Sequence, residues 1–242
     1  MAPTYLQIAD ELAHRIARRR PGAAVESENE LASLFHVNRL TARAALGELE
    51  RRYVVRRAKG RGTFVARRVE YRIGPDRPPS WTETVREAGA TPRTQNEPVR
   101  SVRPPAWARR ELGLREGDRA LLVERRRWVD DELATWATSY VRPDVVPGLE
   151  QRMGPDSALY QVLTAGYHLE PRRAWSRCEF EVASEAVARH LELRGRDHVS
   201  VVRGRLDCAR RGMPIEAAVT YNRMDVLNIV YEFGAPSPEE PT

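Results

Sequence analysis

The chain has 242 residues, which is long enough for two modest domains with separate hydrophobic cores. It contains no apolar run of the roughly 20 residues that a membrane span needs, and no apolar signal-peptide core, so a cytoplasmic protein without a membrane partner is expected. Its only cysteines, Cys178 and Cys208, are far apart and lack metal-ligand spacing, so reduced thiols are expected rather than a disulfide or a metal site.

The positive charge is concentrated in the first quarter of the chain. Residues 1–68 carry 14 Lys and Arg against 7 Asp and Glu, a balance of +7. Residues 69–242 carry the remaining 26 against 27, a balance of −1. The excess positive charge therefore lies in the first 68 residues, and it would attract the phosphates of a nucleic acid to that part of the protein.

A first helix is predicted over residues 5–19. Tyr5, Ile8, Leu12 and Ile16 recur at helical spacing and would form one apolar face. We expect this helix to pack behind the segment that follows and to close a small core.

Residues 27–52 carry the strongest motif in the sequence, two short amphipathic helices joined by a tight turn. Ser27 and Glu30 have the spacing of a capping box, and Asn38 can cap the second helix. The main apolar positions expected in the second helix are Leu40, Ala44, Leu46 and Leu49. The pattern predicts a helix–turn–helix, whose second helix enters DNA.

Three polar side chains occupy the first turns of that second helix. Arg39, Thr41 and Arg43 lie where a helix in the major groove presents side chains to base edges, and arginine can pair with guanine through two hydrogen bonds. Leu40 lies among them, and it either contacts a thymine methyl group or packs against the first helix.

A glycine-rich hairpin is predicted directly after the recognition helix. Two strand-like runs, 53–58 and 63–66, flank a cationic tip made of Lys59, Gly60, Arg61 and Gly62. Such a hairpin is typical of a wing that lies against the minor groove and its phosphates, the alternative being an ordinary solvated hairpin.

Residues 4–67 resemble the winged helix–turn–helix of the GntR family of bacterial regulators. The resemblance lies in Tyr5, Ile8 and Leu12, in the run VESENELASLFHVNRLTARAAL, and in GRGTFV. The family's Leu-Pro-Ser-Glu is Val25-Glu26-Ser27-Glu28 here, without the proline, and its Ser-Arg is Asn38-Arg39. The resemblance implies DNA contacts by Asn29, Asn38, Arg39, Thr41, Arg43, Lys59, Gly60, Arg61 and Gly62.

The rest of the chain is predicted to be an α+β domain built on an antiparallel sheet. Residues 69–80 are rich in charge, Gly and Pro and are interpreted as a linker that can include a short strand; residues 81–233 form the domain, and the Pro- and Glu-rich residues 234–242 form a flexible tail. The expected helices are 81–88, 105–112, 157–165 and 184–191. The expected strands are 120–129, 135–141, 174–182, 199–208 and 214–221.

This second domain resembles the UTRA domain of the HutC-like subgroup of the same family. The matching residues are Trp81-Thr82-Glu83, Arg125-Arg126-Arg127, Asp130-Asp131, Ser139-Tyr140, Leu159-Tyr160 and Met213-Pro214-Ile215-Glu216. The UTRA architecture is similar to that of chorismate lyase, so the resemblance implies a chorismate-lyase-like sheet domain that binds an effector and supplies dimerisation.

Arg125 and Arg127 are the main candidates for holding that effector. They lie two apart on a predicted strand, so their side chains leave the same face of the sheet, where two guanidinium groups suit a phosphate or a carboxylate. The resemblance agrees and implies further contacts from Ser80, Thr82, Tyr160, Glu216 and Tyr221. The alternative is that the two arginines pair with Glu124, Glu179 or Glu181 on neighbouring strands.

Two departures from the family concern the hydroxyl groups of the effector. A frequent glutamate of the family is Ala137 here, and a serine is Ala158, with Ser157 one position away. These replacements thin the hydrogen-bonding network that a sugar would use. They favour a smaller or less hydroxylated anion.

No catalytic or metal site is predicted. The five histidines form no ligand cluster, and no nucleophile elbow or paired-carboxylate motif is present, so neither an enzyme nor a bound cofactor is expected. The sequence predicts a homodimeric repressor that binds an inverted repeat in double-stranded DNA and is released by a small phosphate-, phosphonate- or carboxylate-bearing effector. The alternatives are an enzyme of chorismate-lyase-like fold fused to a DNA-binding domain, and an architectural DNA-binding protein without a ligand.

Overall fold

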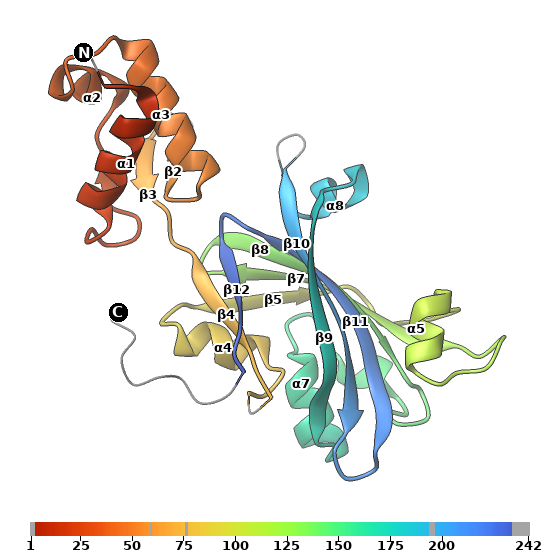
Figure 1. Ribbon diagram of the computed structural model, residues 1–242. Coiled ribbons are helices and arrows are strands. Elements are labelled where there is room, and N and C mark those ends of the chain that lie inside the picture. Colours follow the sequence, from red (N-terminus) through yellow and green to blue (C-terminus); the bar gives the residue numbers. More distant parts are fainter. Residues whose placement is uncertain (1–2, 59, 76, 194–196, 234–242) are drawn as a thin grey trace. The chain divides into compact units, whose positions relative to one another are not determined.

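The computed structural model describes residues 3–58, 60–75, 77–193 and 197–233 (Figure 1). The chain divides into two compact units, residues 1–68 and 69–242, which are described separately. Lys59 and the predicted tail, residues 234–242, lie outside the described residues. None of the described helices is long and apolar enough to cross a membrane.

The first unit is three helices with a small three-stranded sheet, as the resemblance implies. Its elements are α1 (Tyr5–Ile16), β1 (Ala24–Val25), α2 (Glu28–Leu34), α3 (Arg39–Arg51), β2 (Val55–Ala58) and β3 (Gly62–Val65). The sheet order is β1-β3-β2, and β2 and β3 form the predicted hairpin. Ile8, Leu12, Leu31, Leu46 and Leu49 fill the core between the helices.

The caps that start α2 and α3 form as the sequence predicts. The Ser27 hydroxyl accepts from the Glu30 amide at 3.3 Å, and the Glu30 carboxylate accepts from the Ser27 amide at 2.7 Å. The buried face of α3 is different from the predicted one, because it consists of Ala42, Ala45, Leu46 and Leu49. Leu40 and Ala44 are exposed, so the predicted stripe began on the wrong side of the helix.

The second unit is organised around a long antiparallel sheet in the order β5-β7-β8-β11-β10-β9, with β6 beside β7. β7 and β8 form one long hairpin, and β10 and β11 form the other. These strands are β5 (Pro92–Asn96), β6 (Arg100–Val102), β7 (Ala120–Val129), β8 (Glu132–Val141), β9 (Pro171–Val182), β10 (His198–Cys208) and β11 (Met213–Arg223). The α+β class and the antiparallel sheet are confirmed.

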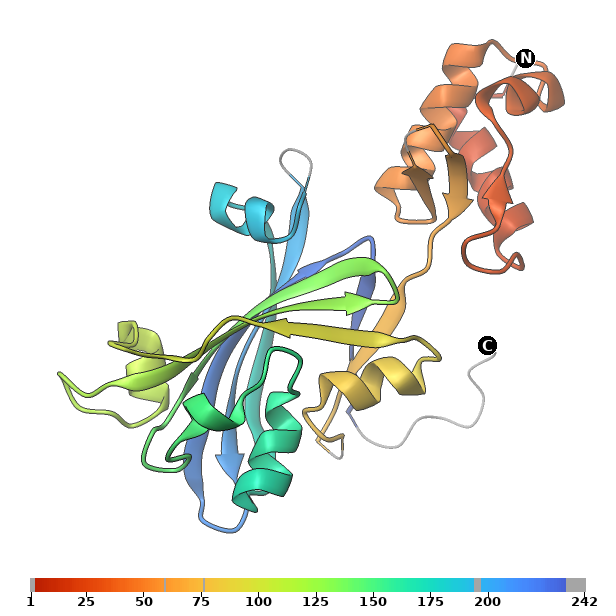
Figure 2. The same cartoon turned by 180° about the vertical axis from the view of Figure 1, so that it is seen from behind.

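The helices of the second unit cover the two faces of this sheet unequally. α5 (Ala106–Glu111) and α8 (Glu185–His190) pack on one face, against Ala217 and Val219 of β11. α6 (Leu149–Arg152), α7 (Leu159–Gln161) and the π-helix η1 (Val162–Gly166) pack on the other, together with α4 (Trp81–Glu87). Figure 2 shows α4 and the green α6–α7 segment in front of the sheet on that second face.

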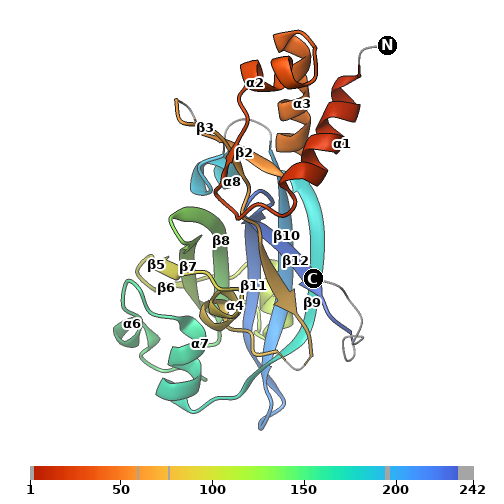
Figure 3. The same ribbon diagram turned by 90° about the vertical axis from the view of Figure 1, so that its left-hand side faces the viewer.

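Residues 69–80, predicted as a linker, belong to the second unit in the structure. Val69–Ile73 forms β4, which pairs in parallel with β12 (Leu227–Tyr231) near the end of the described chain (Figure 3). Val69, Ile73 and Leu227 are buried, although the surrounding sequence is rich in charge and proline. A partner some 150 residues away therefore fixes a segment whose local composition favours a linker.

Candidate functional site

The start of α3 presents the polar side chains that the sequence assigns to DNA. The side chains of Arg39 and Arg43 are 68% and 65% exposed. Asn38 caps the helix by accepting from the Thr41 amide at 2.8 Å, so its amide oxygen is engaged in the cap. Leu40 is 75% exposed, which excludes packing against α1 and leaves it free to meet a base.

A carboxylate that the sequence analysis did not single out organises the arginines of this surface. Glu28 in the first turn of α2 contacts Arg39 Nε at 2.9 Å and lies 3.8 Å from both Arg43 Nε and Arg57 Nη1. Arg57 also donates to the Arg43 carbonyl oxygen at 3.0 Å. Glu28 thus holds guanidinium groups from α3 and β2 close together on one surface of the first unit. These contacts can be seen only in the folded unit. Asn29, the next residue, is exposed.

The tip of the β2–β3 hairpin uses its glycines as the sequence suggests. Gly60 and Gly62 adopt φ angles of 73° and 111°, which other residues reach only with strain. Arg61 between them is exposed, whereas the structure does not describe Lys59. The tip therefore keeps its backbone turn and presents the exposed Arg61 at the surface.

We expect a double change of Lys59 and Arg61 to alanine to weaken binding to specific and random DNA alike. Each lost phosphate contact lowers the slope of log affinity against log salt by about one unit, so a loss of one to two units is expected. Titrations by fluorescence anisotropy at several salt concentrations measure it. A slope equal to that of the unchanged protein would show that the wing does not touch DNA.

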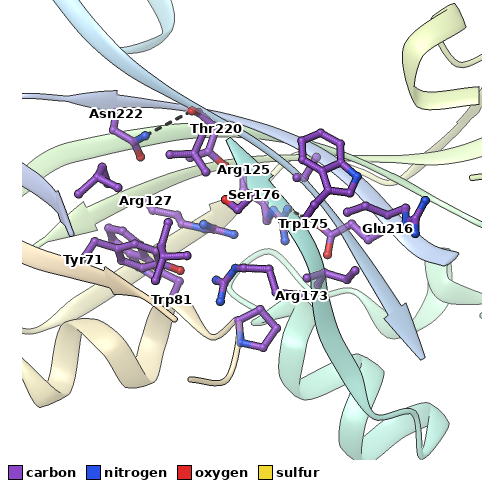
Figure 4. A pocket seen from close by; sticks show the side chains of 18 residues that line it. Tyr71, Trp81, Arg125, Arg127, Arg173, Trp175, Ser176, Glu216, Thr220 and Asn222 are labelled. Carbon is purple, nitrogen blue, oxygen red and sulfur yellow. Dashed lines mark hydrogen bonds and ion pairs between the residues drawn. The ribbon is translucent and has the colours of Figure 1, made fainter. Parts of the chain in front are cut away.

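The second unit contains a cavity between the sheet, α4 and the β4–β12 pair (Figure 4). It has two adjoining compartments of about 100 and about 50 Å³. Arg125, Arg127, Trp81 and Glu216 border both compartments. Six of the seven predicted effector residues line this cavity, because Ser80, Thr82 and Tyr160 border the smaller compartment.

Arg125 belongs to a buried network rather than to the open part of the cavity. Its guanidinium donates to Ser139 Oγ and to Glu216 Oε1 at 3.3 Å, and Ser139 donates to Glu216. All three side chains are nearly inaccessible to water. Burial lowers the pKa of Arg125, and the Glu216 carboxylate counteracts that effect by favouring its charged form. Glu216 therefore acts first as the partner of Arg125.

Arg127 has no such partner. Among the described residues no carboxylate lies within ion-pair distance of its guanidinium, which is 5.5 Å from the centre of the Trp81 ring. Burial, and then the neighbouring Arg125 charge, lower its pKa to about 9, which still leaves it protonated at neutral pH. Both causes disfavour the cation, and a bound anion would relieve them.

The glutamates that the sequence offered as alternative partners of Arg125 and Arg127 are paired with other arginines or face away from the cavity. Glu124 pairs with Arg100, and Glu179 pairs with Arg203. Along β9, the alternation of side chains places Glu179 and Glu181 on the face of the sheet away from the cavity. The pairing found for Arg125 is with Glu216, and this residue was predicted as a ligand contact.

The structure does not bring Tyr221 into the cavity. Glu216 and Tyr221 are five residues apart on β11, so their side chains leave opposite faces of the sheet. Tyr221 stacks on Trp136 with ring centres 5.4 Å apart, under α8. Asn222, one residue on, borders the larger compartment instead. Strand parity alone could have corrected this assignment.

Three buried N–H groups around the cavity have no hydrogen-bond partner among the described residues. They are Trp81 Nε1, Arg125 Nε and Arg173 Nη1. Buried donors are normally paired, and here all three unpaired ones border the larger compartment. The cavity can therefore offer hydrogen bonds to a ligand with acceptor oxygens. Within the described chain no three His, Cys, Asp or Glu side chains are placed to hold a metal ion.

Two families of known domains match consecutive parts of the sequence. The family described as "Bacterial regulatory proteins, gntR family" matches residues 4–65, and the family described as "UTRA domain" matches residues 87–227. The first match covers the helix–turn–helix and its wing, and the second covers the sheet and most of the cavity.

Curated relatives and a solved structure match nearly the whole of this chain. The HTH-type transcriptional regulator GgaR of Escherichia coli (strain K12) is 27% identical over 233 residues, 95% of this chain and 91% of that protein. The HTH-type transcriptional regulator Rv0792c of Mycobacterium tuberculosis is 28% identical over 241 residues, 98% of this chain and 86% of that protein. The crystal structure of PhnF from Mycobacterium smegmatis matches 95% of this chain and all of its own with a TM-score of 0.66 at 22% identity, a likeness of fold.

Proposed function

Since this chain belongs to the GntR family of bacterial regulatory proteins and carries a UTRA domain, we propose that it is a repressor released from its operator by a small anion. The family match describes bacterial regulatory proteins, and the named relatives are HTH-type transcriptional regulators. The relatives found are regulators, which favours this proposal over the enzyme and the architectural protein.

The DNA half of the proposal is supported by the surface at the start of α3. Arg39 and Arg43 lie one helical turn apart, both exposed and both oriented by Glu28, so they can reach base edges together. Asn38, Thr41 and Asn29 lie beside them, and Arg61 with Lys59 and the two glycines would meet the backbone at the wing. A single such helix reads only a short half-site, so we propose a homodimer on an inverted repeat.

The effector half is carried by one observation, which is that Arg127 lies beside a cavity and has no ion-pair partner among the described residues. A charge removed from water without a partner is costly, and an anion bound there would supply that partner. Ser80, Thr82 and Tyr160 border the smaller compartment and would position the ligand, with Glu216 holding Arg125 in place. Ala137 and Ala158 leave this site without the carboxylate and the hydroxyl that a sugar would use, which favours a compact anion.

Release from DNA would follow from linked equilibria. If the anion binds more tightly to a conformation whose recognition helices do not match the half-site spacing, operator affinity falls by the same coupling factor. The spacing must match about one turn of DNA, so a small change in the dimer is enough.

Replacing Arg127 with alanine should abolish anion binding by the second unit while leaving it folded. The matched control is Arg126→Ala, because Arg126 is one residue away on the same strand but faces α8, 3.9 Å from Glu192. Thermal unfolding with inorganic phosphate or methylphosphonate measures binding, since a ligand of the folded state raises Tm. We expect both anions to stabilise the unchanged protein and Arg126→Ala, but not Arg127→Ala. Equal stabilisation of all three proteins would place the anion elsewhere.

A further inference from the structure

A second arginine enters the cavity from β9, and a bulge in that strand aims it there. The pairing of β9 with β10 shifts by one residue between Trp175 and Arg173, which leaves Ala174 extra. Trp175 Nε1 donates to Glu111 of α5, on the face of the sheet away from the cavity. Two residues apart on a regular strand, Arg173 would share that face with Trp175; the bulge turns it to the cavity instead.

Close packing holds the bulge in place. A Cβ atom at Gly204, on β10 beside the bulged segment, would lie 2.9 Å from the Trp175 carbonyl oxygen, so a larger residue would force the strands apart. Bulges that re-aim a side chain are over-represented next to active sites. The direction of Arg173 is therefore set by the backbone pairing of the sheet.

Arg173 has no carboxylate partner among the described residues, and its Nη1 atom is buried without a hydrogen bond. Of the described residues that border the larger compartment, only Glu216 is acidic. Its carboxylate is already held by Arg125 and Ser139. Arg173 is thus a second cation at this cavity that lacks an anionic partner.

The larger compartment has two positive charges that no acidic side chain of the described residues balances. The arginines that border it are Arg125, Arg127, Arg173 and Arg205. Glu216 pairs with Arg125, and Asp207 pairs with Arg205 at 2.9 Å. The two charges that remain belong to Arg127 and Arg173, so a ligand with two negative charges would neutralise the compartment.

The guanidinium groups of Arg127 and Arg173 turn toward each other across the larger compartment (Figure 4). They belong to β7 and β9, which are not neighbours in the sheet, so the fold brings them together across the cavity. Like charges repel more strongly where water is scarce, and an anion between them turns that repulsion into attraction. The two side chains therefore point to one shared anion.

Two further donors border the same compartment. Trp81 Nε1 and Arg125 Nε are buried there without a hydrogen-bond partner. A phosphoryl group has three terminal oxygens that accept hydrogen bonds strongly, whereas a carboxylate has two. The compartment of about 100 Å³ is several times larger than the roughly 10–15 Å³ that one water needs, which leaves room for one such group.

We propose that Arg173 is an effector-binding residue, and that Arg127 and Arg173 hold one doubly charged phosphoryl group between them. Two unbalanced cations match its two negative charges, so a singly charged anion of the same shape binds more weakly. This inference rests on the anion site proposed above, to which it adds a residue and a requirement for charge.

Two esters of the same shape test the charge requirement on the full-length protein. Methyl phosphate carries two negative charges at pH 7.5, because the second pKa of a phosphate ester is about 6, whereas methyl sulfate carries one. Isothermal titration calorimetry should show that the unchanged protein binds methyl phosphate at least about tenfold more tightly, since hydrogen bonds from guanidinium groups strengthen with the charge of the acceptor.

Three variants assign that preference to its residue. Arg173→Ala should bind methyl phosphate about tenfold to a hundredfold more weakly, as expected for a lost hydrogen bond to a charged group, and should lose most of the preference over methyl sulfate. Arg173→Lys keeps the positive charge and should keep most of the preference. Arg172→Ala, an exposed neighbour on the same strand, should behave as the unchanged protein does. Tryptophan fluorescence melting shows that each variant is folded, because all five tryptophans belong to the second unit.

Three results would overturn the shared phosphoryl group. They are equal affinities of the unchanged protein for the two esters, an unchanged affinity of Arg173→Ala for methyl phosphate, and an equal loss for both esters in Arg173→Ala. Failure of the anion site itself gives a different result, because methyl phosphate would then bind Arg127→Ala as tightly as the unchanged protein, or bind neither in the millimolar range.

Discussion

Replacing Arg125 with alanine should destabilise the second unit by about 3–5 kcal/mol, the usual cost of removing one member of a buried ion pair. The change leaves the Glu216 carboxylate and the Ser139 hydroxyl buried without their shared cation. For a unit of this size each kcal/mol lowers Tm by about 2–4 °C, so a fall of about 6–20 °C is expected. Tryptophan fluorescence during heating measures it, because every tryptophan lies in residues 69–242.

A double change distinguishes the contribution of the Arg125–Glu216 ion pair to stability from the contribution of the volume that the two side chains fill. Arg125→Met with Glu216→Leu removes both charges and keeps apolar volume, so it should recover most of the lost stability. Arg127→Ala, which breaks no ion pair among the described residues, should cost much less. If Arg125→Ala has the same Tm as the unchanged protein, the network does not stabilise the fold, and Arg125 is free to bind a ligand directly.

This expectation decides how the effector site can be tested. A variant that lacks both Arg125 and Arg127 would lose its response to an anion through unfolding as readily as through a lost contact. Arg127→Ala, compared with Arg126→Ala, distinguishes a lost ligand contact from unfolding. The same argument excludes Glu216 as a clean probe of ligand binding.

Replacing Arg39 and Arg43 together with alanine should weaken specific operator binding by at least about thirtyfold. Each arginine that reaches a base contributes roughly 1–3 kcal/mol, and tenfold in affinity is about 1.4 kcal/mol. The loss should be larger for the operator than for random DNA, because base contacts carry the specificity. Fluorescence anisotropy with both DNAs at one salt concentration measures the difference.

The control for this result lies on the same helix. Arg51, in the last turn of α3, has a side chain that is 69% exposed and pairs with Glu48. Arg51→Ala removes the same charge far from the first turns, so operator binding should change little. If Arg51→Ala weakens binding as much as Arg39→Ala does, the arginines act through total charge and α3 does not read bases as proposed.

The sequence by itself determined the features that depend on neighbouring residues. Helix caps depend on residues close in sequence, so the capping box of Ser27 with Glu30 and the N-cap residue Asn38 marked the starts of α2 and α3 correctly. Strand alternation placed Arg125 and Arg127 on one face of β7, and both border the cavity. The sequence also located the excess positive charge in residues 1–68, the unit that contains the helix–turn–helix, since net charge can be counted without knowing the fold.

Only the tertiary structure decided the features that depend on distant residues. Glu216 holds Arg125 across 91 positions, and β12 pairs with β4 near the other end of the second unit, where composition alone favoured a linker. Leu40 was expected among the apolar positions of α3, but its side chain is exposed because the core lies on the other side of the helix. The bulge at Ala174 turns Arg173 to the cavity, since the pairing of two strands sets the face that a side chain takes.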